Sequence, residues 1–329
     1  MRRGWLPIAL MTTLIVALGA YSEVHQSTFL GKSNLTNLLL AALPLVLVSL
    51  GQATALLVGG FDISVAALMT LCVVTASYTM TATTTGPALV FGAFALVGVG
   101  LATGIFNTIL IRVLRLPSIV ATLGTLSVLE GLSLLLRAFP QGAISSDATS
   151  AVTTTVGFVP LAFVGVVVLA ALADLWLYRS RSGLAFRAVG LDSTSSRRLG
   201  MSTGRTILVA FTVCSVLASF GGFFLAAEVQ VGSPIIGNQA LESIAAAVLG
   251  GASLAGGKGS YVGTLLAALF LTEINNVLPL FQQPTEYADM TIGALILLAL
   301  VLYQAPELIQ RFRASRRPLE LEATASVSV

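Results

Sequence analysis

Long apolar segments dominate this sequence and constrain its fold more than any other feature. Of its 329 residues, 56% are hydrophobic and 9% are charged, whereas a soluble domain carries about 25% charged residues. A helix needs about 20 mostly apolar residues to span a bilayer. Ten segments approach that length, at Leu6–Tyr21, Leu35–Val58, Ile63–Met80, Ala88–Ile111, Ser118–Leu136, Val159–Tyr178, Thr206–Val229, Gln239–Leu254, Tyr261–Leu280 and Tyr287–Tyr303. The sequence therefore predicts an all-α integral membrane protein, a polytopic bundle of about ten transmembrane helices.

The positions of lysine and arginine predict how this bundle is oriented. If the N-terminus is cytoplasmic, fifteen of the 17 basic residues fall on the cytoplasmic side, and only Lys32 and Arg137 fall outside. Basic loops are retained in the cytoplasm. We therefore expect both termini in the cytoplasm, a transmembrane domain over residues 1–310 and a basic, disordered cytoplasmic tail over residues 311–329. The first segment could instead be a signal peptide, although its length favours a retained helix.

A glycine-rich turn separates two of the apolar segments. Glycine permits positive φ and close backbone approach, so we predict a structural hinge at Gly250, Gly251, Gly256, Gly257, Lys258 and Gly259, and a smaller one at Gly59, Gly60 and Asp62. Asp62 is expected to cap the helix that follows it. The larger turn is not a phosphate-binding loop, because Gly257 interrupts the required spacing and Gly259 stands where a hydroxyl residue is needed.

Three stretches resemble motifs of one family. Gly59–Val65 resembles the signature Gly-Gly-x-Asp-Leu-Ser-Val, Thr122–Ser133 resembles a second motif, and Ile244–Gly259 resembles a third, with its paired Gly-Gly steps. These motifs are typical of the permease subunits of bacterial ABC importers for ribose, xylose and related monosaccharides, within the branched-chain-type permease superfamily. The resemblance covers about residues 35–305, in the family's order.

The resemblance implies a transport subunit of the bacterial cytoplasmic (inner) membrane and not an enzyme. Its implied partners are cytoplasmic ABC ATPase subunits that hydrolyse ATP, an extracytoplasmic solute-binding protein, and a second permease subunit, either identical or homologous. A basic cytoplasmic segment resembles the family's ATPase coupling segment and supplies the candidates Arg187, Gly190, Ser195, Arg197, Arg198 and Gly200. The family usually has Ala-Ala where this chain has Ser195-Ser196. The sequence therefore does not decide which residues of this segment fit into the ATPase groove.

Polar residues and one aromatic residue are candidates for a shallow outward cavity in the substrate pathway, because sugars are recognised by polar groups and aromatic faces. They are Asn107, Glu130, Phe224, Glu228, Gln239, Glu242, Asn275 and Asn276. Glu228 and Glu242 could equally contact the binding protein. Two cysteines and one histidine offer no metal site, and we expect no cofactor and no nucleic-acid partner.

The sequence does not decide which solute is transported. A monosaccharide is the leading candidate, and nucleosides, polyols or the sugar-derived autoinducer are alternatives from the same superfamily. A stand-alone ion-coupled carrier is the other class, and it would need discontinuous helices around a midplane ion site.

Overall fold

The computed structural model describes residues 5–84, 86–235, 237, 239–284, 286–287, 290–295 and 297. Its helices are α1 (Trp5–His25), α2 (Lys32–Leu57), α3 (Val65–Thr79), α4 (Pro87–Arg112), α5 (Ser118–Leu136), α6 (Ser146–Thr153), α7 (Leu161–Arg179), α8 (Arg181–Leu191), α9 (Ser193–Arg198), α10 (Thr203–Val229), α11 (Gln239–Leu249) and α12 (Tyr261–Leu280). Four short strands are β1 (Gln141–Ala143), β2 (Thr155–Val156), β3 (Val159–Pro160) and β4 (Val231–Gly232). The expected tail over residues 311–329 and much of the expected segment Tyr287–Tyr303 lie outside the described residues.

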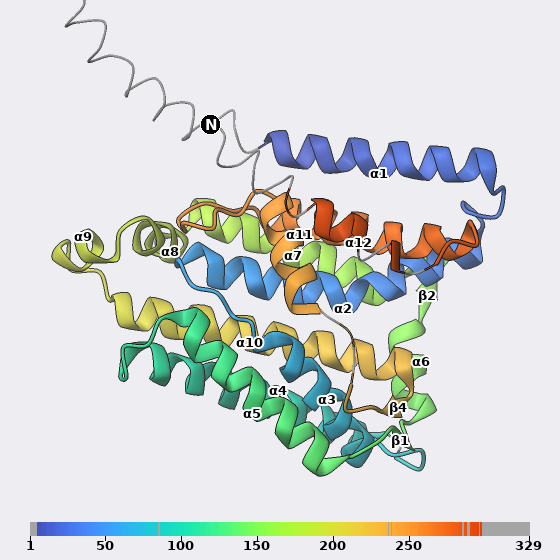
Figure 1. Cartoon of the computed structure of the whole chain (residues 1–329), viewed down its shortest axis with the longest axis horizontal. Coiled ribbons are helices and arrows are strands. Elements are labelled where there is room, and N and C mark those ends of the chain that lie inside the picture. The colour runs from blue at the N-terminus through green and yellow to red at the C-terminus, as the bar shows by residue number, and fades with distance from the viewer. Residues whose placement is uncertain are drawn as a thin grey trace, which may run out of the picture.

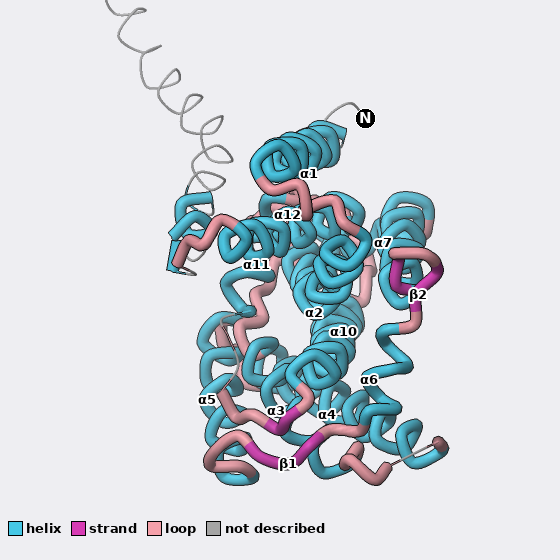
Figure 2. The backbone as a smooth tube through the Cα atoms, turned by 90° about the vertical axis from the view of Figure 1, so that its right-hand side faces the viewer, coloured by secondary structure: helices cyan, strands magenta, loops and turns pink. Residues whose placement is uncertain are grey.

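Helix α2 is the centre of the bundle. Every residue from Ala42 to Leu57 is buried, so this helix touches protein on all sides, as expected of a helix that is apolar all round. Figure 2 shows α2 and α10 in the middle, α1 and α12 on one side of them, and α3, α4 and α5 on the other. Helix α12 is also mostly buried, whereas α1, α4, α5 and α7 keep wide apolar faces exposed, and in a membrane protein such faces meet lipid or another subunit.

Seven helices among the described residues are long and apolar enough to cross a membrane. They confirm an all-α, multi-pass membrane protein. Two other expected segments form shorter helices, α3 with 15 residues and α11 with 11, which at about 1.5 Å per residue are shorter than the ~30 Å hydrocarbon core. Helix α3 starts late because Phe61–Ser64 is not helical, and α11 ends at Leu249 because the glycine-rich turn follows.

Helices α4 and α10 approach each other closely at Gly104. A Cβ atom at this position would lie 2.6 Å from the Cα atom of Thr212 and 2.9 Å from the carbonyl oxygen of Phe211. Only glycine fits such a contact, and small residues of this kind let membrane helices pack backbone to backbone. A Cβ atom at Gly100, one turn earlier, would lie 2.9 Å from the carbonyl oxygen of Ser215, so both glycines serve packing within this chain.

The two ends of the bundle differ in structure. One end carries α8 and α9, and the other carries α6 and the strands, where β1 pairs with β4 and β2 with β3 (Figure 1). At the strand end Arg137 is buried: its Nε donates to Ser77 Oγ at 2.6 Å, and its guanidinium stacks on the Tyr78 ring at 4.2 Å. This arginine therefore holds the ends of α3 and α5 together.

Candidate coupling junction

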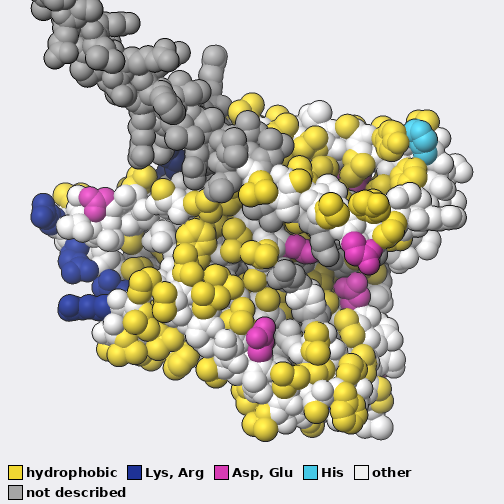
Figure 3. Space-filling model, viewed as in Figure 1, with side chains coloured by type: hydrophobic (Ala, Val, Ile, Leu, Met, Phe, Trp, Pro, Cys, Tyr) yellow, Lys and Arg dark blue, Asp and Glu magenta, His cyan; other side chains and the backbone are white. Residues whose placement is uncertain are grey.

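Two short helices, α8 and α9, follow α7 at the basic end of the molecule (Figures 1 and 3). Each has a side-chain N-cap. Ser180 Oγ accepts from the N–H of Gly183 at 2.9 Å, and Asp192 Oδ1 accepts from the N–H groups of Thr194 and Ser195 at 2.8 and 3.1 Å. The Ser195 hydroxyl also donates to Asp192 and, with these two N–H groups, lowers the pKa of that carboxyl. These caps define two separate helices joined at Asp192.

The inner face of α8 is seated on the bundle. Gly183, Phe186 and Val189 are buried on this face. Phe186 packs edge-to-face on Trp176 of α7, with ring centroids 5.1 Å apart, and joins a small apolar cluster with Val58 and Phe211. Because α8 touches the end of α2, α7 and α10 at once, it is a fixed element of the fold.

Gly190, near the end of α8, lies against the backbone of two buried turns. A Cβ atom at Gly190 would overlap the carbonyl oxygen of Leu57 and lie 2.6 Å from the nitrogen of Gly257. The two turns also bond to each other, since the N–H of Gly257 donates to the carbonyl of Leu57 at 3.0 Å. Gly190 therefore sits where the α2–α3 turn and the glycine-rich turn between α11 and α12 meet.

Asp174 of α7 fixes the start of α12. Its carboxylate accepts from the Ser260 hydroxyl at 2.9 Å and from the N–H groups of Tyr261 and Val262 at 2.7 and 3.3 Å. The negative charge thereby meets the positive end of the helix dipole. Asp174 is not among the residues predicted from the sequence, although it is the one acidic residue within Leu161–Arg179 and an acid in an apolar segment is a functional signal by default.

Tyr178, one turn after Asp174, joins the same elements. Its hydroxyl donates to the carbonyl of Gly259 at 2.8 Å, and the guanidinium of Arg187 lies 5.0 Å from its ring centroid. Helix α7 thus connects α8 with the glycine-rich turn.

A buried polar cluster holds the other turn, between α2 and α3. Asp62 accepts from the N–H and hydroxyl of Ser64 at 3.0 and 2.5 Å, and the Asn107 amide donates to Ser64 Oγ at 2.9 Å. Thr125 of α5 donates to Asn107 Oδ1 at 2.6 Å. Asp62 does not bond to the first turn of α3; it fixes Ser64, the N-cap residue of that helix. The cluster ties the turn to α4 and α5 and fills the hydrogen-bonding capacity of buried groups.

Together these contacts connect a surface helix with the interior. Movement of α8 would press directly on the backbone of the turns that lead into α3 and α12. Packed interiors resist compression and transmit displacement. Of the predicted coupling residues, Arg187 and Gly190 lie in this junction, and Ser195, Arg197, Arg198 and Gly200 lie on or just after α9.

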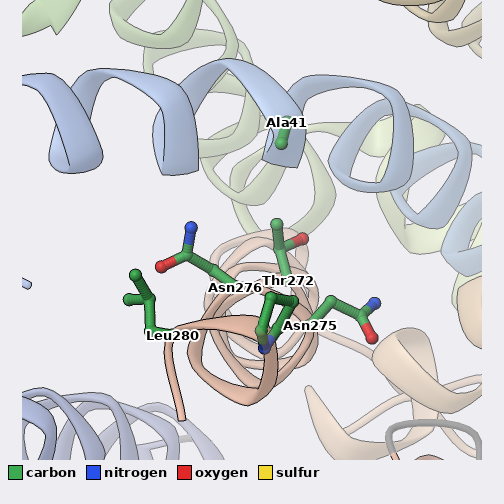
Figure 4. A pocket seen from close by; sticks show the side chains of 6 residues that line it. Ala41, Thr272, Asn275, Asn276 and Leu280 are labelled. Carbon is green, nitrogen blue, oxygen red and sulfur yellow. The ribbon is translucent and has the colours of Figure 1, made fainter. Parts of the chain in front are cut away.

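The candidates for the substrate pathway are not gathered at one place. Asn107 is buried in the Asp62 cluster, whereas Glu130 and Glu228 are exposed and Phe224, Gln239 and Glu242 are half-buried. Asn275 and Asn276 line a pocket of about 380 Å³ near the end of α12, with Ala41 of α2 opposite (Figure 4). Figure 4 shows Thr272 and Asn276 on the side of α12 that faces α2. Asn276 exchanges two 3.2 Å hydrogen bonds with Asn34.

The chain is thus a multi-pass helical membrane protein with a short surface helix, α8, seated on two largely buried turns. A family model described as the permease component of the branched-chain amino acid transport system matches residues 34–300. The chain belongs to this family of permease components.

Several curated relatives share most of their length with this chain. It is 35% identical over 266 residues to the autoinducer 2 import system permease protein LsrC of Enterobacter sp. (strain 638), which covers 78% of this chain and 75% of the relative. It is 32% identical over 294 residues to the protein of the same name from Yersinia enterocolitica, covering 87% and 79% of the two chains. The corresponding protein of Yersinia pseudotuberculosis serotype O:3 is 32% identical over 291 residues, covering 87% and 82%. No solved structure matches this chain.

Proposed function

We propose that this chain is the permease subunit of an ABC importer that carries autoinducer 2 or a related sugar-like solute across the bacterial inner membrane. The relatives named above are autoinducer 2 import permeases, which favours this solute over ribose or xylose within the same superfamily. Two permease subunits form the pathway, a cytoplasmic ATPase supplies energy, and an extracytoplasmic binding protein delivers the solute.

The observation that carries the proposal is the position of Gly190. An ATPase that binds at the cytoplasmic surface must move helices inside the membrane, and α8 contacts, through its backbone, the two turns that lead into α3 and α12. Its outward face offers exposed apolar side chains at Leu184 and Leu191, with Leu199 just beyond α9. Exposed apolar residues within a charged rim are typical of a protein-binding surface. We place ATPase binding there.

The topology completes the proposal. With α8 and α9 in the cytoplasm, the strand end with α6 faces outward, and both termini are cytoplasmic if the segment Tyr287–Tyr303 forms a tenth span. The pocket at Asn275 and Asn276 then lies in the outer half, where the solute enters. Its amide groups suit hydroxyl-rich ligands, and Glu228 and Glu242 lie on the outward-facing side for the binding protein.

Reconstitution in proteoliposomes tests this function. The full chain is reconstituted with the ATPase of its transport system inside the vesicles and the binding protein outside. It should take up autoinducer 2 only when ATP is enclosed in the vesicles with the ATPase. Ribose, presented with the same binding protein, is the matched control for solute and should be taken up much less.

Two outcomes would contradict the proposal. Uptake by this chain alone, driven by an ion gradient, would make it a stand-alone carrier. Uptake of ribose in preference to autoinducer 2 would assign the solute to the monosaccharide class.

A further inference from the structure

A second pocket lies at the basic end, beside the coupling junction, and shares Arg197 with the predicted coupling residues. Its volume is about 450 Å³, and it is lined by Ile111 and Arg112 at the end of α4, by Arg115 in the following loop and by Arg197 of α9. The Arg112 guanidinium lies over the first turn of α10, because a Cβ atom at Gly204 would be 3.5 Å from its Nη2. Three arginines from two separate parts of the chain therefore meet at one hollow.

No carboxylate among the described residues forms an ion pair with any of these guanidinium groups. Asp192, the acid that begins α9, is already bound by the N–H groups and hydroxyl next to it. Like charges that converge without a counter-ion repel one another. Arg115 also holds a φ of 56°, a conformation that non-glycine residues adopt at a cost. Arg115 and Arg197 are exposed and Arg112 is half-buried, so an anion that enters the pocket can reach all three guanidinium groups.

An exposed apolar stripe runs along α4 and ends at Val113, the residue after Arg112 of the pocket. Ile105, Ile109 and Val113 are four residues apart and share one helix face, and Val113, the residue after Arg112, is 70% exposed. A free anion would gain nothing from this stripe. A lipid would, because its acyl chain can lie along α4 while its phosphate reaches the arginines.

We propose that the pocket formed by Arg112, Arg115 and Arg197 binds the phosphate headgroup of an anionic phospholipid, with one acyl chain along Ile105, Ile109 and Val113. Guanidinium groups bind phosphate oxygens through paired hydrogen bonds, and basic pockets beside membrane helices on the cytoplasmic side suit such headgroups. Bound there, the lipid bridges α4 and α9. The inference needs only that the chain lies in a membrane, and it is independent of the transported solute.

Native mass spectrometry of the purified full chain tests this site. The protein is offered phosphatidylglycerol or phosphatidylcholine with the same acyl chains, and the wild type should retain phosphatidylglycerol in preference. The double variant Arg115→Gln/Arg197→Gln should bind phosphatidylglycerol about 30-fold more weakly, which corresponds to ~2 kcal/mol. It leaves Arg112, the half-buried member, in place, and an unchanged Tm checks that the variant is folded.

The matched control is Arg181→Gln/Arg198→Gln, which removes the same charge from the same end but touches no residue of the pocket. It should keep the affinity of the wild type.

Equal loss in both double variants would mean unspecific attraction, and equal retention of both lipids would mean that only the apolar stripe binds. Displacement by inorganic phosphate alone would indicate a free-anion site. If the pocket variant keeps its lipid but fails to copurify with the ATPase, the anion is an acidic side chain of that partner; each of these four results overturns the proposal.

Discussion

Replacing Gly190 with alanine tests whether α8 acts on the two turns beneath it. The added methyl group would overlap the carbonyl oxygen of Leu57 and stand 2.6 Å from the nitrogen of Gly257. All the groups that it meets are backbone, so no side-chain rotation can relieve the contact. Restoring an ordinary 3.4 Å contact with Gly257 alone requires α8 to move outward by about 0.8 Å, and relieving the closer overlap with Leu57 requires a larger shift.

The size of the effect follows from two opposed terms. Alanine in a helix is favoured over glycine by about 1 kcal/mol, whereas overpacking a tight contact costs about 1–3 kcal/mol, and more where the neighbours cannot yield. We expect the overlap to win, so that the free energy of unfolding falls by about 2 kcal/mol. The control is Gly124→Ala in α5, which has no atom within 4 Å of the new methyl group and should leave Tm unchanged or raise it.

The functional assay separates binding of the ATPase from the transmission of its motion. The outward face of α8 is unaltered in Gly190→Ala, so the ATPase should still copurify and hydrolyse ATP in proteoliposomes. Uptake of autoinducer 2 should be strongly reduced, because α8 no longer contacts the turns closely. Wild-type uptake together with a wild-type Tm would refute the idea that this contact transmits force.

Three other predictions concern the start of α12, the Asp62 cluster and the membrane topology. Asp174→Ala should lower the free energy of unfolding by about 1–3 kcal/mol, because three hydrogen bonds at the start of α12 are lost; an unchanged Tm would contradict this role. Thr125→Val should cost about 1–2 kcal/mol through the unpaired oxygen of Asn107, measured by thermal unfolding, and should leave copurification of the ATPase intact. In a background without cysteine, Ser146→Cys should be labelled by an impermeant maleimide from outside and Ser193→Cys only after the membrane is opened; labelling of both from one side would refute the proposed topology.

Membrane character and family could be predicted from the sequence because both depend on local patterns. Long apolar runs and a 9% charged fraction leave only a membrane bundle, and seven of the expected spans appear as long helices. The glycine-rich turn was also visible, since Gly251, Gly256 and Gly257 take the positive φ that other residues avoid.

Which side chains contact one another was decided by the tertiary structure alone. Asn107 is predicted from the sequence as a pathway residue, and the structure places its side chain in the cluster around Asp62. Asp174 was overlooked because its hydrogen-bond donors, Ser260 to Val262, lie at the start of another helix far along the chain. A hydropathy pattern gives the length of a helix and which residues are apolar. It cannot say which neighbour each face meets, because all faces of an apolar helix look alike until packing, close glycine contacts such as Gly190 on Leu57 and buried hydrogen bonds choose among them.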